Sequence, residues 1–138
     1  MPNASSVELA AGEFRKVTID SSFLCNHTGI QLVKDRTYSF EVDANERWYD
    51  AQYSCNADGY PSIGSMRFFE WSRRIPKENW FKLIGGIGRG GAPCIVIGTS
   101  LPIFTATSTG ELICFANDAL LMYWNNRGSV TLSVTRLE

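Results

Sequence analysis

The chain has 138 residues, of which 44% are hydrophobic and 20% charged, so it can bury a core and we expect one domain spanning residues 1–138. Its 13 basic and 14 acidic side chains almost cancel and form no basic stripe. Nucleic-acid binding is therefore not expected, because it needs clustered Lys and Arg to neutralise phosphates.

The secondary structure predicted from the sequence is almost entirely β. In residues 37–42 and again in residues 129–135, apolar and polar side chains alternate, which is typical of a half-buried antiparallel strand. In chain order, the expected strands are residues 14–19, 37–42, 48–53, 81–87, 94–97, 112–115 and 129–135. Residues 66–71 fit either a short helix or an irregular strand. Many short strands separated by glycine-containing turns indicate an all-β sandwich or barrel.

The segment Gly86-Ile87-Gly88-Arg89-Gly90-Gly91 matches the GxGxxG pattern of dinucleotide-binding proteins. In those proteins the turn opens a helix, whose N-terminus binds the pyrophosphate. Here a strand-like stretch, residues 94–97, follows the turn instead. The glycines therefore predict a tight hairpin rather than a nucleotide site.

Cysteine and histidine offer little for catalysis or for zinc. The four cysteines, Cys25, Cys55, Cys94 and Cys114, have no CxxC spacing, and we favour reduced thiols over two disulfides. The one histidine, His27, shares a strand face with Cys25, but the sequence offers no third group to orient it as a base. A thiol enzyme and a zinc site are both unfavoured, and we expect no enzymatic activity.

Membrane insertion and secretion by the general route are not expected either. No apolar run reaches the length of a membrane span, and the first residues lack the pattern of a secretory signal. We therefore expect the protein in the cytoplasm, or exported by a route that uses no recognisable signal peptide.

The richest group of oxygen ligands lies near the C-terminus. Asn117-Asp118 and Asn125-Asn126 flank a short loop, and Arg127-Gly128-Ser129 leads into the last strand. Calcium binds six to eight oxygens from carboxylates, amides and backbone carbonyls, and such a loop can supply several of them. Asn125 to Gly128 alone would be interpreted as an ordinary hairpin turn. The carboxylate of Asp118 on the preceding strand favours the calcium site.

Residues 110–118 and 123–130 together resemble the bacterial LecA (PA-IL-like) galactose-binding lectins. In that family an Asn-Asp pair ends a strand, a six-residue loop follows, and an Asn-Asn-x-Gly-Ser turn leads into the last strand, as at Asp118 and Asn125-Asn126 here. The resemblance implies a jelly-roll-like antiparallel β-sandwich of the galactose-binding-domain type. It also implies a single Ca²⁺ ion at one end of that sandwich.

The resemblance assigns the calcium ligands residue by residue. It implies side-chain oxygens from Asp118, Asn125 and Asn126, and backbone carbonyls from Met122 and from near Ala51. Two neighbouring hydroxyls of a sugar would complete the coordination of the ion.

The resemblance also implies a set of sugar contacts: Asp118, Asn125, Ala119, Trp124 and Asp58. The family's histidine and glutamine contacts fall at about Cys55 and Asp58, which do not preserve them. Trp124 replaces a small residue, so its ring could stack on the sugar, block the site or cap the edge of the sandwich.

The function predicted from the sequence is calcium-dependent binding of galactose or a related sugar. The alternative is a non-catalytic interaction or oligomerisation module of the same fold that has lost sugar binding. A homo-oligomer would raise the avidity of weak single sites.

Overall fold

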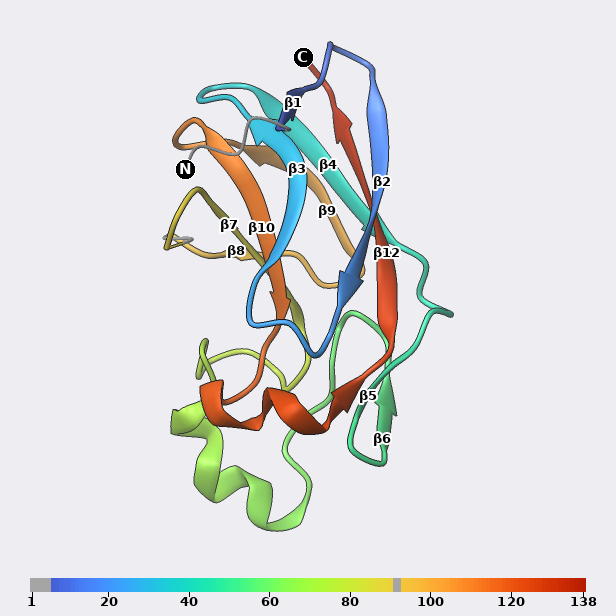
Figure 1. Cartoon of the computed structure of the whole chain (residues 1–138), viewed down its shortest axis with the longest axis vertical. Coiled ribbons are helices and arrows are strands. Elements are labelled where there is room, and N and C mark those ends of the chain that lie inside the picture. The colour runs from blue at the N-terminus through green and yellow to red at the C-terminus, as the bar shows by residue number, and fades with distance from the viewer. Residues whose placement is uncertain (1–5, 91–92) are drawn as a thin grey trace.

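Two β-sheets face each other and enclose the core in the computed structural model, which describes residues 6–90 and 93–138 (Figure 1). The first sheet has the strand order β1 (Val7–Glu8), β3 (Asn26–Leu32), β10 (Gly110–Ala116), β7 (Leu83–Ile87), β8 (Ile95–Val96). The second has the order β2 (Phe14–Asp20), β12 (Ser129–Arg136), β4 (Thr37–Val42), β9 (Ser100–Thr105). Apart from the parallel pair β1–β3, neighbouring strands are antiparallel.

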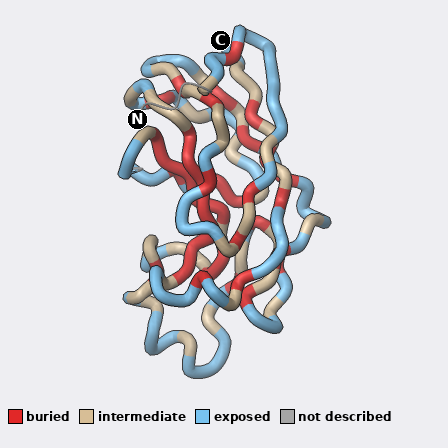
Figure 2. The backbone as a smooth tube through the Cα atoms, viewed as in Figure 1, coloured by how far each residue is buried: buried red, intermediate tan, exposed pale blue. Residues whose placement is uncertain are grey.

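Side chains from both sheets meet in the space between them, where Figure 2 shows the buried backbone concentrated. Strand β12 illustrates the cause, because Val130, Leu132 and Val134 are buried and the residues between them are not. Its register places Leu132 opposite Val42 and Val134 opposite Phe40. The alternation in residues 129–135 thus predicted the inward face correctly.

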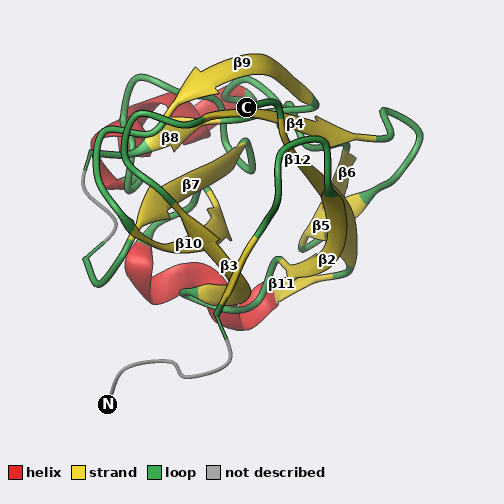
Figure 3. Ribbon diagram, turned by 90° about the horizontal axis from the view of Figure 1, so that it is seen from above, coloured by secondary structure: helices red, strands yellow, loops and turns green. Residues whose placement is uncertain are grey.

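One end of the sandwich carries a small third sheet and two 3-10 helices, seen at the bottom of Figure 1. The sheet has the order β11 (Asn126–Arg127), β5 (Trp48–Asp50), β6 (Tyr53–Cys55). The helices are η1 (Gly64–Ser72) and η2 (Leu120–Asn125). Seen from above in Figure 3, the helical segments lie beyond the strands, one near β8 and the other near β11. None of the described helices is long and apolar enough to cross a membrane.

The structure confirms the expected all-β sandwich and corrects several of its elements. Residues 48–53 are not one strand: β5 and β6 form a hairpin that turns at Ala51, whose φ is 53°. The strand expected over residues 81–87 begins only at Leu83, because Phe81 has a φ of 63°. Residues 66–71 belong to the helix η1, and strands β3 and β9 were not predicted.

The glycine-rich segment after β7 leads into β8, which pairs antiparallel with β7. The predicted hairpin is therefore confirmed for the two strands, and within the described residues no helix begins where a dinucleotide site would require one. The connection is longer than a tight turn, and Gly91 lies outside the described residues.

Candidate functional site

Four segments that are distant in the sequence meet at the end of the sandwich that carries the helices. Asp118 is the second residue after β10, and η2 leads from there to β11. Strand β11 pairs antiparallel with β5, which places Asn126 opposite Asp50 and Arg127 opposite Tyr49. Gly128 permits the close turn into β12, because its φ is 86° and an added Cβ would lie 3.2 Å from the Cα of Trp48.

A cavity of about 410 Å³ lies between η1, η2 and the β5–β6 hairpin. Its walls are mostly apolar, with a few polar groups, as is usual for small-molecule sites. The lining residues are Asp50, Ala51, Tyr53, Met66, Phe69, Ser72, Trp80, Asp118, Ala119, Met122 and Asn125. Five of these, namely Ala51, Asp118, Ala119, Met122 and Asn125, belong to the site predicted from the sequence.

Three side-chain oxygens at this end are buried without a hydrogen-bond partner among the described residues: Asp118 Oδ2, Asn125 Oδ1 and Asn126 Oδ1. In Asp118 and Asn126, the other polar atom of the side chain already forms a hydrogen bond. Asp118 Oδ1 accepts from the Ala119 N–H at 2.7 Å, and Asn126 Nδ2 donates to the Ser21 carbonyl at 3.0 Å. Buried polar atoms rarely lack partners, and these three oxygens are free of protein partners within the described residues and suited to bind a ligand.

The donor set suits a hard cation. A carboxylate oxygen and two amide oxygens are the ligands that Ca²⁺ takes, and Asp118 and Asn125 both line the cavity. Asn126 lies close enough to interact with the Asp118 carboxyl group. Within the described ranges, no three His, Cys, Asp or Glu side chains gather in a way that could hold a metal. A metal at this site would therefore depend on the asparagine oxygens.

Asp50 is a second carboxylate in the cavity, and the sequence analysis missed it. Its side chain is buried, and its Oδ2 accepts a hydrogen bond from the Tyr60 hydroxyl at 2.5 Å. Only the pairing of β5 with β11 brings it beside Asn126, and that pairing carries no local signal in the sequence. The turn at Ala51 is held by a hydrogen bond from its N–H to the Asn125 carbonyl, at 3.2 Å.

The two carboxyl groups are hard to ionise together in the absence of a cation. Burial raises the pKa of Asp118 to about 6, and the charge of Asp50 adds to the effect. The Ala119 N–H and the Asn126 side chain oppose this rise in pKa. Burial likewise raises the pKa of Asp50, although the Tyr60 hydroxyl acts in the opposite direction. A bound divalent cation would favour the ionised form of both groups.

Asn117 serves a different purpose from its neighbour Asp118. Its Oδ1 accepts from the Ile75 N–H at 2.9 Å, and its Nδ2 donates to the carbonyls of Ile75, Glu78 and Asn79. The buried amide thus fixes the loop between η1 and β7, which forms part of the cavity wall through Trp80. Its side chain is therefore engaged in the fold, unlike those of Asp118, Asn125 and Asn126, which each have an oxygen without a partner in the part of the chain that the structure describes.

The structure does not bring two of the expected sugar contacts into the cavity. Asp58 Oδ1 accepts from the Thr99 N–H at 2.7 Å and its Oδ2 from the Thr99 hydroxyl at 3.0 Å, so its carboxylate serves the fold. Trp124 is 78% exposed and is not among the residues that line the cavity. Cys55 is buried in the core.

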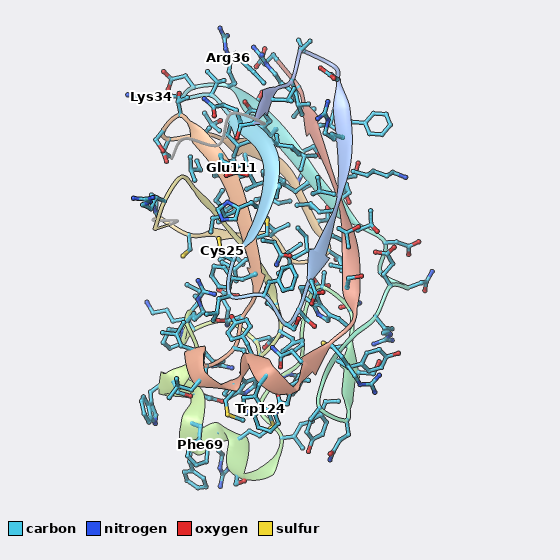
Figure 4. All side chains as sticks on the ribbon, in the orientation of Figure 1. Cys25, Lys34, Arg36, Phe69, Glu111 and Trp124 are labelled. Carbon is cyan, nitrogen blue, oxygen red and sulfur yellow. The ribbon has the colours of Figure 1, made fainter. Side chains whose placement is uncertain are left out.

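The pair Cys25 and His27 has a third neighbour that the sequence analysis did not find. Cys25 Sγ lies 3.9 Å from His27 Nε2, and His27 Nδ1 lies 3.0 Å from Glu111 Oε1. Figure 4 shows Cys25 and Glu111 in the β3–β10 region, away from the two helices, and none of the three side chains lines the cavity. Burial raises the pKa of the Cys25 thiol, which disfavours the thiolate that a nucleophile needs. All four cysteines are free.

Comparison with known proteins shows a similarity of structure and none of sequence. No protein-family profile matches the chain, and no curated protein sequence does. Among solved structures, the N-terminal domain of EclA, described as a PllA-like lectin, superposes with a TM-score of 0.63 at 15% sequence identity. The match covers 88% of this chain and 94% of that domain. The chain therefore has the β-sandwich fold of a lectin domain, and the narrower resemblance to LecA remains a prediction.

Proposed function

We propose that this protein is a calcium-dependent lectin that binds galactose or a related sugar. The observation that carries the proposal is the set of buried oxygens without partners, Asp118 Oδ2, Asn125 Oδ1 and Asn126 Oδ1. They belong to the three side chains that the LecA resemblance assigns to calcium, and they lie in a protein with a lectin fold. Binding alone is proposed, with no catalytic residue.

Each residue of the site would bind the calcium ion, the sugar or both. The side chains of Asp118, Asn125 and Asn126 and the carbonyls of Met122 and Ala51 would hold Ca²⁺, whose role is to coordinate two neighbouring sugar hydroxyls. Asp118 and Asn125 line the cavity and can also hydrogen-bond those hydroxyls. Ala119 would contact the sugar at the start of η2.

The apolar wall of the cavity would pack against the C–H face of the sugar ring. Trp80 offers its indole there, with the polar Nε1 already donating to Ser62 Oγ at 2.9 Å. A single monosaccharide is a small ligand, so its affinity should lie in the millimolar to tens-of-micromolar range, about 4 to 7 kcal/mol. Several sites on one homo-oligomer would raise the avidity.

The alternative, a module of this fold that has lost sugar binding, predicts a site blocked by Trp124. That ring lies outside the cavity, so the observed geometry favours the lectin.

A glycan array in calcium and again in EDTA tests the proposal, with Asp118→Asn as the site variant. The matched control is Asp43→Asn, since Asp43 is exposed and does not line the cavity. We expect a calcium-dependent signal on galactose-type glycans for the parent and the control, and none for Asp118→Asn. An array without signal in either buffer would reject the lectin and leave the alternative.

A further inference from the structure

Six large apolar side chains are exposed together at the end of the molecule that carries the cavity. Each is more than half exposed, and Leu121 reaches 88%. They form what is called here the apolar rim: Phe68, Phe69 and Trp71 from η1, and Leu120, Leu121 and Trp124 from η2. Figure 4 shows Phe69 and Trp124 at this end. Exposed apolar side chains gathered at one end of a folded protein are typical of an interaction surface.

The rim is held in place by the same backbone that forms the candidate site. A β-bridge joins Arg73, just after η1, to Ala119, just before η2. The Arg74 N–H donates to the Asp118 carbonyl at 3.1 Å. Phe69 belongs both to the rim and to the cavity wall. The rim therefore borders the cavity through Phe69 and is tied to it by the backbone that links the two helices.

The chemistry of the rim is that of a membrane–water interface. Such interfaces favour Trp and Phe side chains, with basic groups close by. The Trp71 Nε1–H donates to the Phe68 carbonyl at 3.1 Å, so this indole can leave water without losing a hydrogen bond. The guanidinium of Arg67, an exposed residue, lies 5.2 Å from the Phe68 ring, where it could meet a lipid phosphate.

We propose that the apolar rim docks on the surface of a lipid bilayer, with the cavity facing the membrane. The choice of a bilayer rests on the proposed function. A second copy of the chain seated on the rim would cover the cavity and exclude a glycan. A bilayer presents sugars from its own surface, so a glycolipid headgroup could enter the cavity while the rim inserts between neighbouring lipids.

Co-sedimentation with phosphatidylcholine–phosphatidylserine vesicles, without sugar-bearing lipid and in EDTA, tests the rim separately from the sugar site. The variant combines Trp71→Ser with Leu121→Ser, because neither residue lines the cavity. The matched control combines Phe14→Ser with Ile103→Ser, two exposed apolar residues on the sandwich strands β2 and β9. We expect the rim variant to lose vesicle affinity by roughly tenfold or more, and the control to keep it.

Four further measurements decide the outcome. Near-ultraviolet circular dichroism of each variant establishes that it is folded, and Leu121→Ser alone provides a milder second test. Asp118→Asn should still bind vesicles, which separates failure of the rim from failure of the lectin. Equal sedimentation of parent and rim variant would overturn the proposal. So would a parent that is a dimer in light scattering and becomes monomeric in the rim variant, since the occupant would then be a second copy.

Discussion

The charge of Asp50 raises the pKa of Asp118, although the two carboxylates come from separate elements of the fold. Both line one cavity, and one oxygen of Asp118 lacks a partner among the described residues. Two buried carboxylates facing one space destabilise the protein unless a proton or a cation lies between them. This relationship underlies the first three predictions.

Replacing Asp118 by Ala should abolish the stabilisation of the protein by calcium. A ligand present at a hundred times its dissociation constant adds about 2.7 kcal/mol to the free energy of unfolding. The variant lacks a charged ligand and should melt at the same temperature with and without calcium, measured by differential scanning calorimetry. Asp43→Ala is the control and should respond like the parent. An equal calcium response in Asp118→Ala would refute the assignment.

The calcium-free protein should become less stable as the pH rises from about 4 to 6. The pKa of Asp118 is about 6 in the folded protein, above its ordinary value of 3.8, so folding favours its protonated form. Its contribution is therefore fully present at low pH and is lost as the pH rises through this window, on the order of 3 kcal/mol. Urea unfolding in EDTA across this range, for the parent and Asp118→Asn, measures it. The variant should show a smaller dependence, and identical curves would contradict the prediction.

Asp50→Asn should weaken calcium binding by about tenfold or more, because it removes one negative charge from the cavity. The same variant should stabilise the calcium-free protein, since the repulsion of Asp118 is gone and Asn can still accept from the Tyr60 hydroxyl. Isothermal titration calorimetry and urea unfolding measure the two effects. Tyr60→Phe is the control, because it removes the hydrogen bond and keeps the charge. Unchanged affinity in Asp50→Asn would limit Asp50 to holding Tyr60.

Asp58→Ala should lower stability and leave sugar affinity unchanged. It removes two hydrogen bonds to Thr99 at an exposed position, which should cost about 1 to 2 kcal/mol. Its side chain does not line the cavity, so calorimetric titration with a galactoside should give the parent's dissociation constant. A weakened sugar affinity in a folded Asp58→Ala protein would restore the role suggested by the LecA resemblance.

The strands that could be predicted are those with one face packed on the core, because apolar and polar residues then alternate in the sequence. Residues 129–135 alternate because one face of β12 packs on the core. Strand β3 was missed because Asn26, His27 and Gly29 are unusual in strands. Strand β9 was missed because it contains Pro102, which an edge strand tolerates.

The residues of the candidate site likewise fall into those that could be predicted from the sequence and those that could not. Asp118, Asn125 and Asn126 lie within one short loop, so their spacing could be recognised from the sequence. Asp50 reaches the site only through the register of β5 with β11. Glu111 reaches His27 only through the pairing of β10 with β3. Contacts that depend on long-range register leave no trace in a single sequence.

The pairing of β5 with β11 also bears on the order in which the chain folds. Such a pairing must close a long loop before it gains any contact, so we expect it to form late in folding, after the transition state. A ligand held across this pairing stabilises interactions that form after the transition state. It would slow the unfolding rate and leave the folding rate almost unchanged. A ligand bound at the candidate site would then increase the kinetic stability of the folded β-sandwich.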